Sequence, residues 1–151
     1  MPGLEDLYRE IILDHYRNPR NRGELPTPPA HRTEGFNPLC GDEIVVYLDV
    51  ADDRIADVKI GGQGCSISQS SASMMTEAVT GRKVDEALGL ATSFRGMMAG
   101  EVEPDEDTFG DLVALKGVVK YPIRIKCAVL AWDMLQDALQ GDGDAAGAHA
   151  H

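Results

Sequence analysis

Two strand-like segments lie side by side in this sequence, with helical patterns before and after them. Residues 44–50 and 54–60 are rich in β-branched residues, and Ala51-Asp-Asp53 between them is typical of a hairpin turn. The order is therefore helix, hairpin and then helices. This order predicts an α+β fold in which a small antiparallel β-sheet packs against several helices.

Apolar residues recur at helical spacing in four segments. The first covers residues 4–16 and ends before Asn18-Pro19. The others cover residues 66–80, 84–98 and 123–139, and the last has Pro122 near its first helical position. In the segment 84–98 we expect Val84, Leu88, Ala91 and Phe94 to face inward.

The remaining segments are less regular. Residues 112–115 predict a short helix, and residues 20–38, rich in Pro, Gly, Arg and Asn, predict an extended connector. A length of 151 residues allows one domain, which we place at residues 1–140. Residues 141–151 are low in complexity and predict a disordered tail.

The charge of the chain argues against two classes of partner. There are 14 Lys and Arg against 25 Asp and Glu, a formal net charge of −11. We therefore expect no nucleic-acid partner and no binding to an anionic membrane surface. The apolar runs are also too short to span a bilayer, and the N-terminus lacks the pattern of a signal peptide, so we expect a cytoplasmic protein. The acidic segment 101–111 is typical of a solvated loop.

The three cysteines, Cys40, Cys65 and Cys127, each fall at a junction between predicted elements. An odd number without a secretion signal argues against a disulfide framework. Cys65 and Cys127 lie near predicted helix N-termini, where partial positive charge favours thiolate over thiol. With 24 and 61 residues between successive cysteines, any convergence has to come from the fold. Three unrelated buried thiols remain the simpler interpretation of the composition.

Asp42 adds a possible oxygen ligand. It follows Cys40 by two residues, so in an extended chain both side chains point the same way. Three thiolates and one carboxylate would suit a tetrahedral zinc site, although Asp42 fits a turn-stabilising role equally well. Arg124 and Lys126 near Cys127 either offset the negative charge of such a site or are solvated.

Other residues fit simpler roles. His15 on the apolar side of the first helix favours a packed, hydrogen-bonded histidine over a base that activates a cysteine. Five further side chains predict core positions: Met74, Met75, Met97, Met98 and Trp132.

Four segments together resemble the U-type iron–sulfur assembly proteins, the family of IscU and the NifU N-terminal domain. They are residues 7–20 (Leu-Tyr-Arg-Glu-Ile-Ile-Leu-Asp-His-Tyr-Arg-Asn-Pro-Arg), 37–42 (Asn-Pro-Leu-Cys-Gly-Asp), 62–68 (Gly-Gln-Gly-Cys-Ser-Ile-Ser) and 124–128 (Arg-Ile-Lys-Cys-Ala). The resemblance runs from the first helix to about Leu139. It implies an α+β fold of the SufE/NifU type, with Cys40, Cys65 and Cys127 as ligands and Asp42 beside them.

Three departures look like the SufU branch of the family. Scaffold members have a histidine where this chain has Lys126, and their Leu-Pro-Pro-Val-Lys chaperone-recognition stretch has no good match in residues 118–122. The stretch between Cys65 and Cys127 is also longer than in typical scaffolds. The SufU branch implies zinc binding and acceptance of sulfur from a pyridoxal-phosphate-dependent cysteine desulfurase.

The main hypothesis is therefore a zinc-bound sulfur acceptor in iron–sulfur cluster biogenesis, with Cys40 as the persulfide acceptor. It would work as a sulfurtransferase together with the desulfurase rather than as a stand-alone enzyme, and would supply downstream iron–sulfur assembly or carrier proteins. One alternative is a scaffold that binds iron or a transient [2Fe–2S] cluster on the same cysteines. Another alternative is a structural zinc module that takes no part in sulfur transfer.

Overall fold

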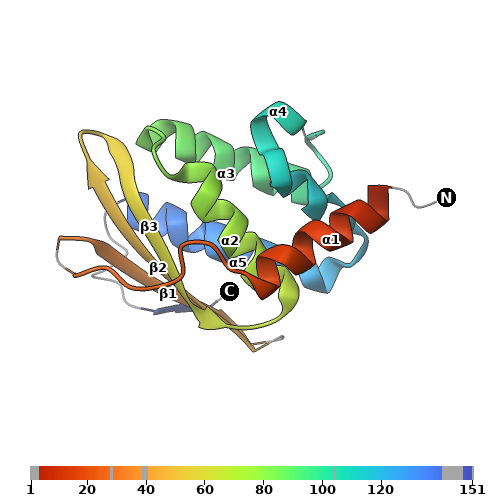
Figure 1. The fold of residues 1–151 in the computed structure, drawn as a ribbon, viewed down its shortest axis with the longest axis horizontal. Coiled ribbons are helices and arrows are strands. Elements are labelled where there is room, and N and C mark those ends of the chain that lie inside the picture. Colours follow the sequence, from red (N-terminus) through yellow and green to blue (C-terminus); the bar gives the residue numbers. More distant parts are fainter. Residues whose placement is uncertain (1–3, 28, 39–40, 104, 141–147, 151) are drawn as a thin grey trace.

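A small sheet is covered on one face by helices in the computed structural model of the protein (Figure 1), which describes residues 4–27, 29–38, 41–103, 105–140 and 148–150. The elements follow in the order α1 (Leu4–Arg17), β1 (His31–Asn37), β2 (Asp42–Ala51), β3 (Arg54–Gln63), α2 (Ser66–Val79), α3 (Val84–Met98), α4 (Glu106–Phe109), the 3₁₀ helix η1 (Gly110–Lys120), α5 (Pro122–Leu139) and β4 (Ala148–Ala150). The predicted α+β class, with an antiparallel sheet against several helices, is confirmed.

The strands lie in the order β3-β2-β1-β4. β2 is antiparallel to both β1 and β3, and its first residue, Asp42, pairs with Asn37, the last residue of β1. Asp52 and Asp53 between β2 and β3 both have positive φ, which matches the type I′ turns that favour tight hairpins. The predicted hairpin is therefore confirmed.

The strand β1 corrects the prediction of a connector over residues 20–38. The inward-facing positions of β1 are Thr33, Gly35 and Asn37, all buried. Because these residues are polar or small, the strand lacks the alternation of apolar and polar residues that identifies a half-buried strand. The segment is a strand because it pairs with β2, although its own sequence does not indicate a strand.

The helices agree closely with the pattern of apolar residues. The segment 84–98 forms α3 with the predicted bounds, but Ala87 and Leu90 are buried together with Ala91 and Phe94, while Val84 and Leu88 are only partly buried. The short helix predicted at 112–115 is part of the longer 3₁₀ helix η1.

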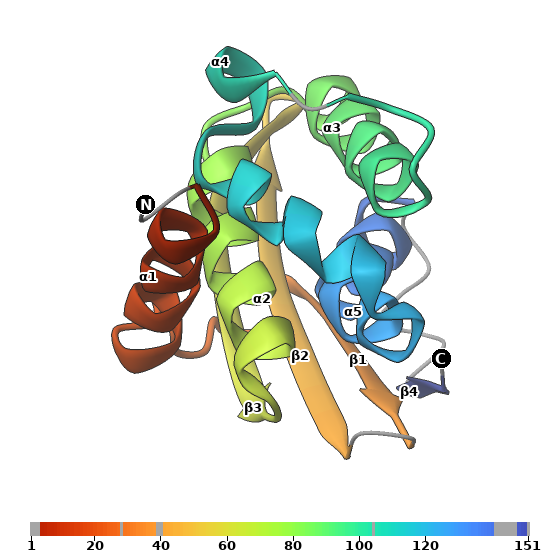
Figure 2. The same cartoon turned by 90° about the vertical axis from the view of Figure 1, so that its right-hand side faces the viewer.

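Two helices cover the sheet directly. α5 packs against β1 and β2, and α2 packs against β3 and β2, while α1, α3 and η1 lie outside them (Figure 2). Trp132 of α5 is fully buried and stacks on Phe94 of α3 with ring centroids 4.9 Å apart. The predicted core positions of Trp132 and of the four methionines are confirmed: Met74, Met75, Met97 and Met98.

None of the helices that the structure describes is both long and apolar enough to cross a membrane. In the C-terminal segment, Ala148–Ala150 pair as a parallel strand with residues 34–36 of β1. Residues 141–147 and 151 lie outside the described part of the chain. The domain bounds 1–140 and the tail 141–151 therefore stay predictions.

Candidate metal centre

The neighbouring ends of β1 and β2 point two polar side chains at the helices. In β2 the buried inner positions are Asp42, Ile44, Val46 and Leu48, at the two-residue spacing of a strand. Asp42 is the first of this row and is fully buried. Asn37, its partner in β1, is also fully buried on the same face. The strand period therefore fixes where these two side chains lie.

Cys65 follows β3 and is the N-cap of α2, as its place after the glycine-rich turn predicts. Its backbone N–H donates to Asp42 Oδ1 at 2.9 Å, and its Sγ lies 3.9 Å from Asp42 Oδ2. The Ser68 N–H at the first turn of α2 donates to Cys65 Sγ at 3.5 Å. An unpaired N–H of a helix N-terminus thus points at the sulfur, which favours negative charge there.

Cys127 lies on a different helix, in the second turn of α5. Its side chain is fully buried, and the Asn37 Nδ2 amide donates to its Sγ at 3.7 Å. Asn37 therefore links the end of β1 to the sulfur on α5. Asn37 is a functional residue that its local sequence does not predict, since β1 has no apolar pattern; its one signal is its place three residues before Cys40.

One ligand atom from each of Asp42, Cys65 and Cys127 lies within 4.8 Å of the other two. A tetrahedral zinc ion with Zn–S bonds of about 2.3 Å and Zn–O bonds of about 2.0 Å holds neighbouring S and O ligands roughly 3.5 Å apart. The 3.9 Å between Cys65 Sγ and Asp42 Oδ2 is close to this value. A buried carboxylate beside two thiols is also costly unless a cation compensates for its charge. The three residues therefore fit a divalent metal that prefers sulfur.

Because Gly64 has no side chain, the Asp42 carboxylate has room beside the backbone at residue 64. A Cβ at residue 64 would lie 2.5 Å from Asp42 Oδ1 and 2.7 Å from Ser68 Oγ. Gly62, with a φ of +100°, is equally restricted, because a Cβ there would lie 2.1 Å from the Glu43 carbonyl oxygen. The glycines of this turn are thus required for the close approach of β2 to the N-terminus of α2.

The structure brings together three of the four predicted site residues: Asp42, Cys65 and Cys127. Cys40 is within residues 39–40, outside the described residues, so its predicted role is not tested. One oxygen of Asp42 accepts the backbone N–H of Cys65, and the other lies 3.9 Å from the Cys65 sulfur. Its role as a metal ligand stays a prediction.

The other polar candidates lie elsewhere. Lys126 and Arg124 are exposed on α5, and Arg124 lines a groove of about 480 Å³ beside α1. His15 is fully buried and bonds Ser73 and Asp111. The prediction of a packed, hydrogen-bonded histidine is confirmed.

The comparisons with known proteins agree with this geometry. A family model described as "NifU-like N terminal domain" matches residues 7–128. The zinc-dependent sulfurtransferase SufU of Bacillus subtilis is 45% identical over 88% of this chain and 89% of its own. The iron–sulfur cluster assembly scaffold protein IscU of Streptococcus pyogenes is 39% identical over 94% of this chain and 88% of its own.

A solved structure shares the fold. The crystal structure of FiSufU from Fervidobacterium islandicum AW-1 matches with a TM-score of 0.80 and 38% identity, over 91% of this chain and 99% of that one. An α+β domain with cysteines converging at one end of its sheet is thus the class of protein that fold and site define. The chain belongs to the NifU-like N-terminal domain family, as the four motifs of the sequence indicate.

Proposed function

We propose that this protein is a sulfur acceptor in iron–sulfur cluster biogenesis, which takes persulfide sulfur from a cysteine desulfurase and passes it to downstream assembly or carrier proteins. The observation that carries the proposal is the convergence of Asp42, Cys65 and Cys127 within 4.8 Å. Cys40 is the fourth member of the site and its acceptor. The name of the Bacillus subtilis relative, a zinc-dependent sulfurtransferase, supports both the metal and the reaction.

Cys40 accepts the sulfur because it lies in the short segment between β1 and β2, whereas Cys127 is fully buried and Cys65 caps a helix. The Cys40 thiolate attacks the outer sulfur of the desulfurase persulfide. The S–S bond of the desulfurase breaks, a new S–S bond forms on Cys40, and the desulfurase cysteine leaves as a thiolate. No electrons are gained or lost overall, so the step needs no further oxidant or reductant.

Asp42, Ser68 and Asn37 hold the other two cysteines in place. Asp42 holds the Cys65 backbone through its Oδ1, and the Ser68 N–H and the Asn37 amide donate to the sulfurs of Cys65 and Cys127. These donors stabilise negative charge on the two sulfurs. Zinc held by Cys40, Asp42, Cys65 and Cys127 would supply a redox-inert positive charge that keeps the cysteines deprotonated at neutral pH.

A second candidate function is a scaffold that carries a [2Fe–2S] cluster on the same cysteines. The IscU relative of Streptococcus pyogenes, a cluster assembly scaffold by name, favours this alternative. Thiolate ligands suit iron as well as zinc. The two functions differ in their effect on the desulfurase. Only a sulfur acceptor removes the persulfide sulfur from the desulfurase, and so speeds its turnover, when iron is absent.

The test combines metal analysis with a desulfurase assay without iron. The purified protein is expected to contain one zinc per chain and to speed sulfide release by a cysteine desulfurase with cysteine and a reductant. Cys40→Ala is expected to abolish the acceleration. The control Glu43→Gln changes an exposed residue next to Asp42 and is expected to leave it intact.

Two outcomes would contradict the proposal. A stable chromophore after anaerobic iron addition, with no acceleration of the desulfurase, would favour the scaffold. A protein that neither accelerates the desulfurase nor keeps its fold without zinc would be a structural zinc module.

A further inference from the structure

A second cluster of metal-ligating side chains lies on the outer side of α2. His15 of α1 is fully buried, and its Nε2 lies 2.9 Å from Asp111 Oδ2 and 3.8 Å from Glu77 Oε1. One ligand atom from each of these residues lies within 4.8 Å of the other two. Three elements, α1, α2 and η1, therefore bring an imidazole and two carboxylates together.

This cluster is separate from the cysteine centre. Ser73, which contacts His15, follows Cys65 by eight residues on α2, a distance of about 12 Å along the helix axis. The two sites therefore share no ligand, and the second one offers only nitrogen and oxygen.

The imidazole is held in the orientation that a metal ligand requires. His15 Nδ1 lies 2.8 Å from Ser73 Oγ, which also accepts the backbone N–H of Arg20 at 2.8 Å. A hydroxyl oxygen has two lone pairs, so Ser73 can accept from both Nδ1–H and Arg20 N–H. With the ring proton on Nδ1, the Nε2 lone pair can bind a cation in place of the hydrogen bond to Asp111. Ser73 is then the outer partner that metal-binding histidines commonly have.

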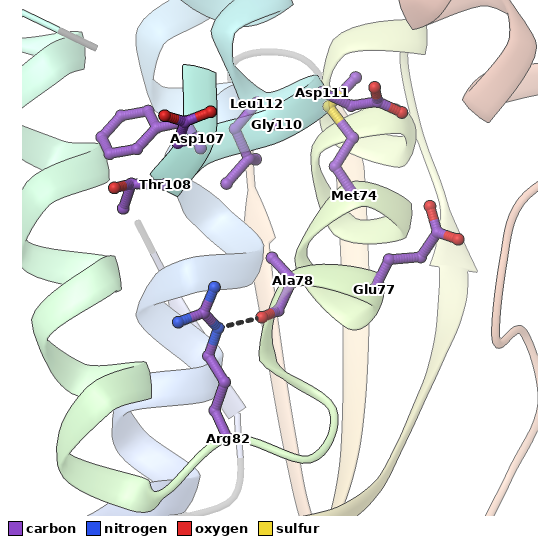
Figure 3. A pocket seen from close by; sticks show the side chains of 10 residues that line it. Met74, Glu77, Ala78, Arg82, Asp107, Thr108, Gly110, Asp111 and Leu112 are labelled. Atoms are coloured by element: carbon purple, nitrogen blue, oxygen red, sulfur yellow. Dashed lines mark hydrogen bonds between the residues drawn. The ribbon is translucent and has the colours of Figure 1, made fainter. Parts of the chain in front are cut away.

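The carboxylates border a cavity with room for water. A cavity of about 270 Å³ is lined by Glu77 and Asp111 together with Met74, Asp107 and Thr108. Figure 3 shows the two carboxylates on one side of this cavity and the Arg82 guanidinium on the other, where Arg82 donates to the Ala78 carbonyl. A water molecule takes about 30 Å³ in the liquid, so several can complete the coordination of an ion.

Acidic side chains gather around the cluster, and two basic residues compete with an ion for them. Asp111 ends the acidic segment 101–111, and the side chains of Glu77 and Asp111 are 51% and 55% exposed, so they can adjust to an ion. Arg82 lies across the cavity from the carboxylates, and Arg20 has its Nε 3.9 Å from Glu77 Oε1. Its closer contact, however, is with Asp14 at 2.6 Å.

We propose that His15, Glu77 and Asp111 form a second divalent metal site, independent of the cysteine centre and of its function. One imidazole nitrogen and two carboxylate oxygens suit Mn²⁺, Fe²⁺ or Zn²⁺. On binding, the ion takes the place of the hydrogen bond between His15 Nε2 and Asp111, and the ring proton resides on Nδ1 and is donated to Ser73.

Mn²⁺ is the best probe, because it is paramagnetic and prefers oxygen and nitrogen to thiolate. The full chain, loaded with a single equivalent of zinc so that only the cysteine centre is filled, is titrated with Mn²⁺ while electron paramagnetic resonance follows the free ion. We expect one Mn²⁺ to bind per chain, with spin-echo modulation from a coordinated imidazole nitrogen. Asp111→Asn and Glu77→Gln, which keep size and hydrogen-bonding capacity, are each expected to weaken binding by roughly tenfold or more.

Glu101→Gln is the matched control, since it removes the same charge from the same acidic segment outside the cluster. It is expected to leave the affinity for Mn²⁺ unchanged. The proposal is overturned if no Mn²⁺ binds at millimolar concentration or if no nitrogen modulation is seen. It is equally overturned if Glu101→Gln weakens binding as much as Asp111→Asn, because binding would then reflect diffuse negative charge. None of these results bears on the sulfur-acceptor proposal.

Discussion

At the scale of single residues, the metal centre depends on side chains that hold the ligands as well as on the ligands. Asp42 is a proposed ligand that also holds another one, because one of its oxygens accepts the Cys65 backbone N–H and the other faces the Cys65 sulfur. Asn37 serves Cys127 in a similar way through its amide. The geometry of the centre is therefore sensitive to residues that are not themselves ligands.

Replacing Asn37 by Ala tests this dependence. The change removes the amide that donates to Cys127 Sγ, and it is expected to lower the free energy of unfolding by about 1–3 kcal/mol. The charge-transfer bands of the Co²⁺-substituted protein are expected to shift, because the sulfur loses a hydrogen bond. The control is Thr33→Val, which removes a buried hydrogen bond from the same strand to the Met134 carbonyl. If both variants give the native Co²⁺ spectrum, Asn37 has no influence on the centre.

Gly64→Ala tests the close approach at the turn after β3. The added Cβ would lie 2.5 Å from Asp42 Oδ1, so Asp42 has to move and the affinity for zinc is expected to fall by roughly tenfold or more. Competition with a chromophoric chelator measures this affinity. Gly89→Ala on the exposed side of α3 meets no atom within 4 Å and is expected to keep the affinity while stabilising the fold by about 0.5–1 kcal/mol. Equal zinc affinity in the two variants would contradict the prediction.

At the scale of helices and strands, α5 connects the core to the metal centre. Its Trp132 stacks on Phe94 of α3 and donates through Nε1 to Ser71 Oγ of α2 at 3.2 Å, while Cys127 lies earlier on the same helix. Packing of α5 therefore determines how far Cys127 reaches toward β1 and β2.

Phe94→Leu is expected to lower the free energy of unfolding by about 1–2 kcal/mol, because it removes the ring pair while keeping an apolar side chain. Urea unfolding followed by the fluorescence of the single tryptophan measures the change. The tryptophan emission is also expected to change in the native state, since its stacking partner is lost. Met97→Leu, another fully packed position on α3, is the control and is expected to keep the native emission. Native emission in Phe94→Leu would contradict the stacking.

The segment after α1 is held by an ion pair that makes stability depend on pH. The hydrogen bond from Arg20 to Asp14 lowers the pKa of the Asp14 carboxyl below its ordinary value. Because the pKa is lower in the folded protein, the stabilisation is present above about pH 4 and is lost as the pH falls through the folded value. Chemical unfolding at pH 7 and pH 2 is expected to show Asp14→Asn less stable than the parent at pH 7 and equally stable at pH 2. A difference that persists at pH 2 would show that the carboxylate charge is not its cause.

At the scale of the whole molecule, the core and the metal centre occupy different places. The core lies between the sheet and the helices α2, α3 and α5, and the centre lies where the ends of β1 and β2 meet α2 and α5. We therefore expect the core to keep its packing without the metal.

Removal of zinc tests this separation. The chelated protein is expected to keep its far-ultraviolet circular dichroism but to unfold at a lower temperature, because a metal that binds only the folded state stabilises it by mass action. Thermal scans of the loaded and chelated protein at equal concentration measure the effect. Complete unfolding of the chelated protein at 25 °C would favour a structural zinc module.

The sequence predicts the helices well because their apolar residues recur at helical spacing. α3 has its predicted bounds, and the hairpin of β2 and β3 follows from β-branched residues around Asp52 and Asp53. The strand β1 is not predicted, since its inner positions carry Thr33, Gly35 and Asn37 instead of apolar residues. β1 forms because it pairs with β2, and a pattern of neighbouring residues cannot show such a pairing.

The metal centre is predictable only in part for the same reason. Local patterns place Cys65 at a helix N-terminus and Cys127 in the first turns of a helix, and the resemblance to the family groups them with Asp42. The contact of Asn37 with Cys127 spans 90 positions of the sequence. Likewise, the approach of His15 to Asp111 spans 96 positions, so neither contact follows from local spacing.

X-ray absorption at the zinc edge of the purified protein tests the central claim most directly, since it counts and identifies the atoms bound to the metal. We predict three sulfur ligands at about 2.3 Å, from Cys40, Cys65 and Cys127, and one oxygen ligand at about 2.0 Å, from Asp42. Cys40→Ser is expected to leave two sulfur ligands. A first shell made of nitrogen and oxygen alone would contradict the account.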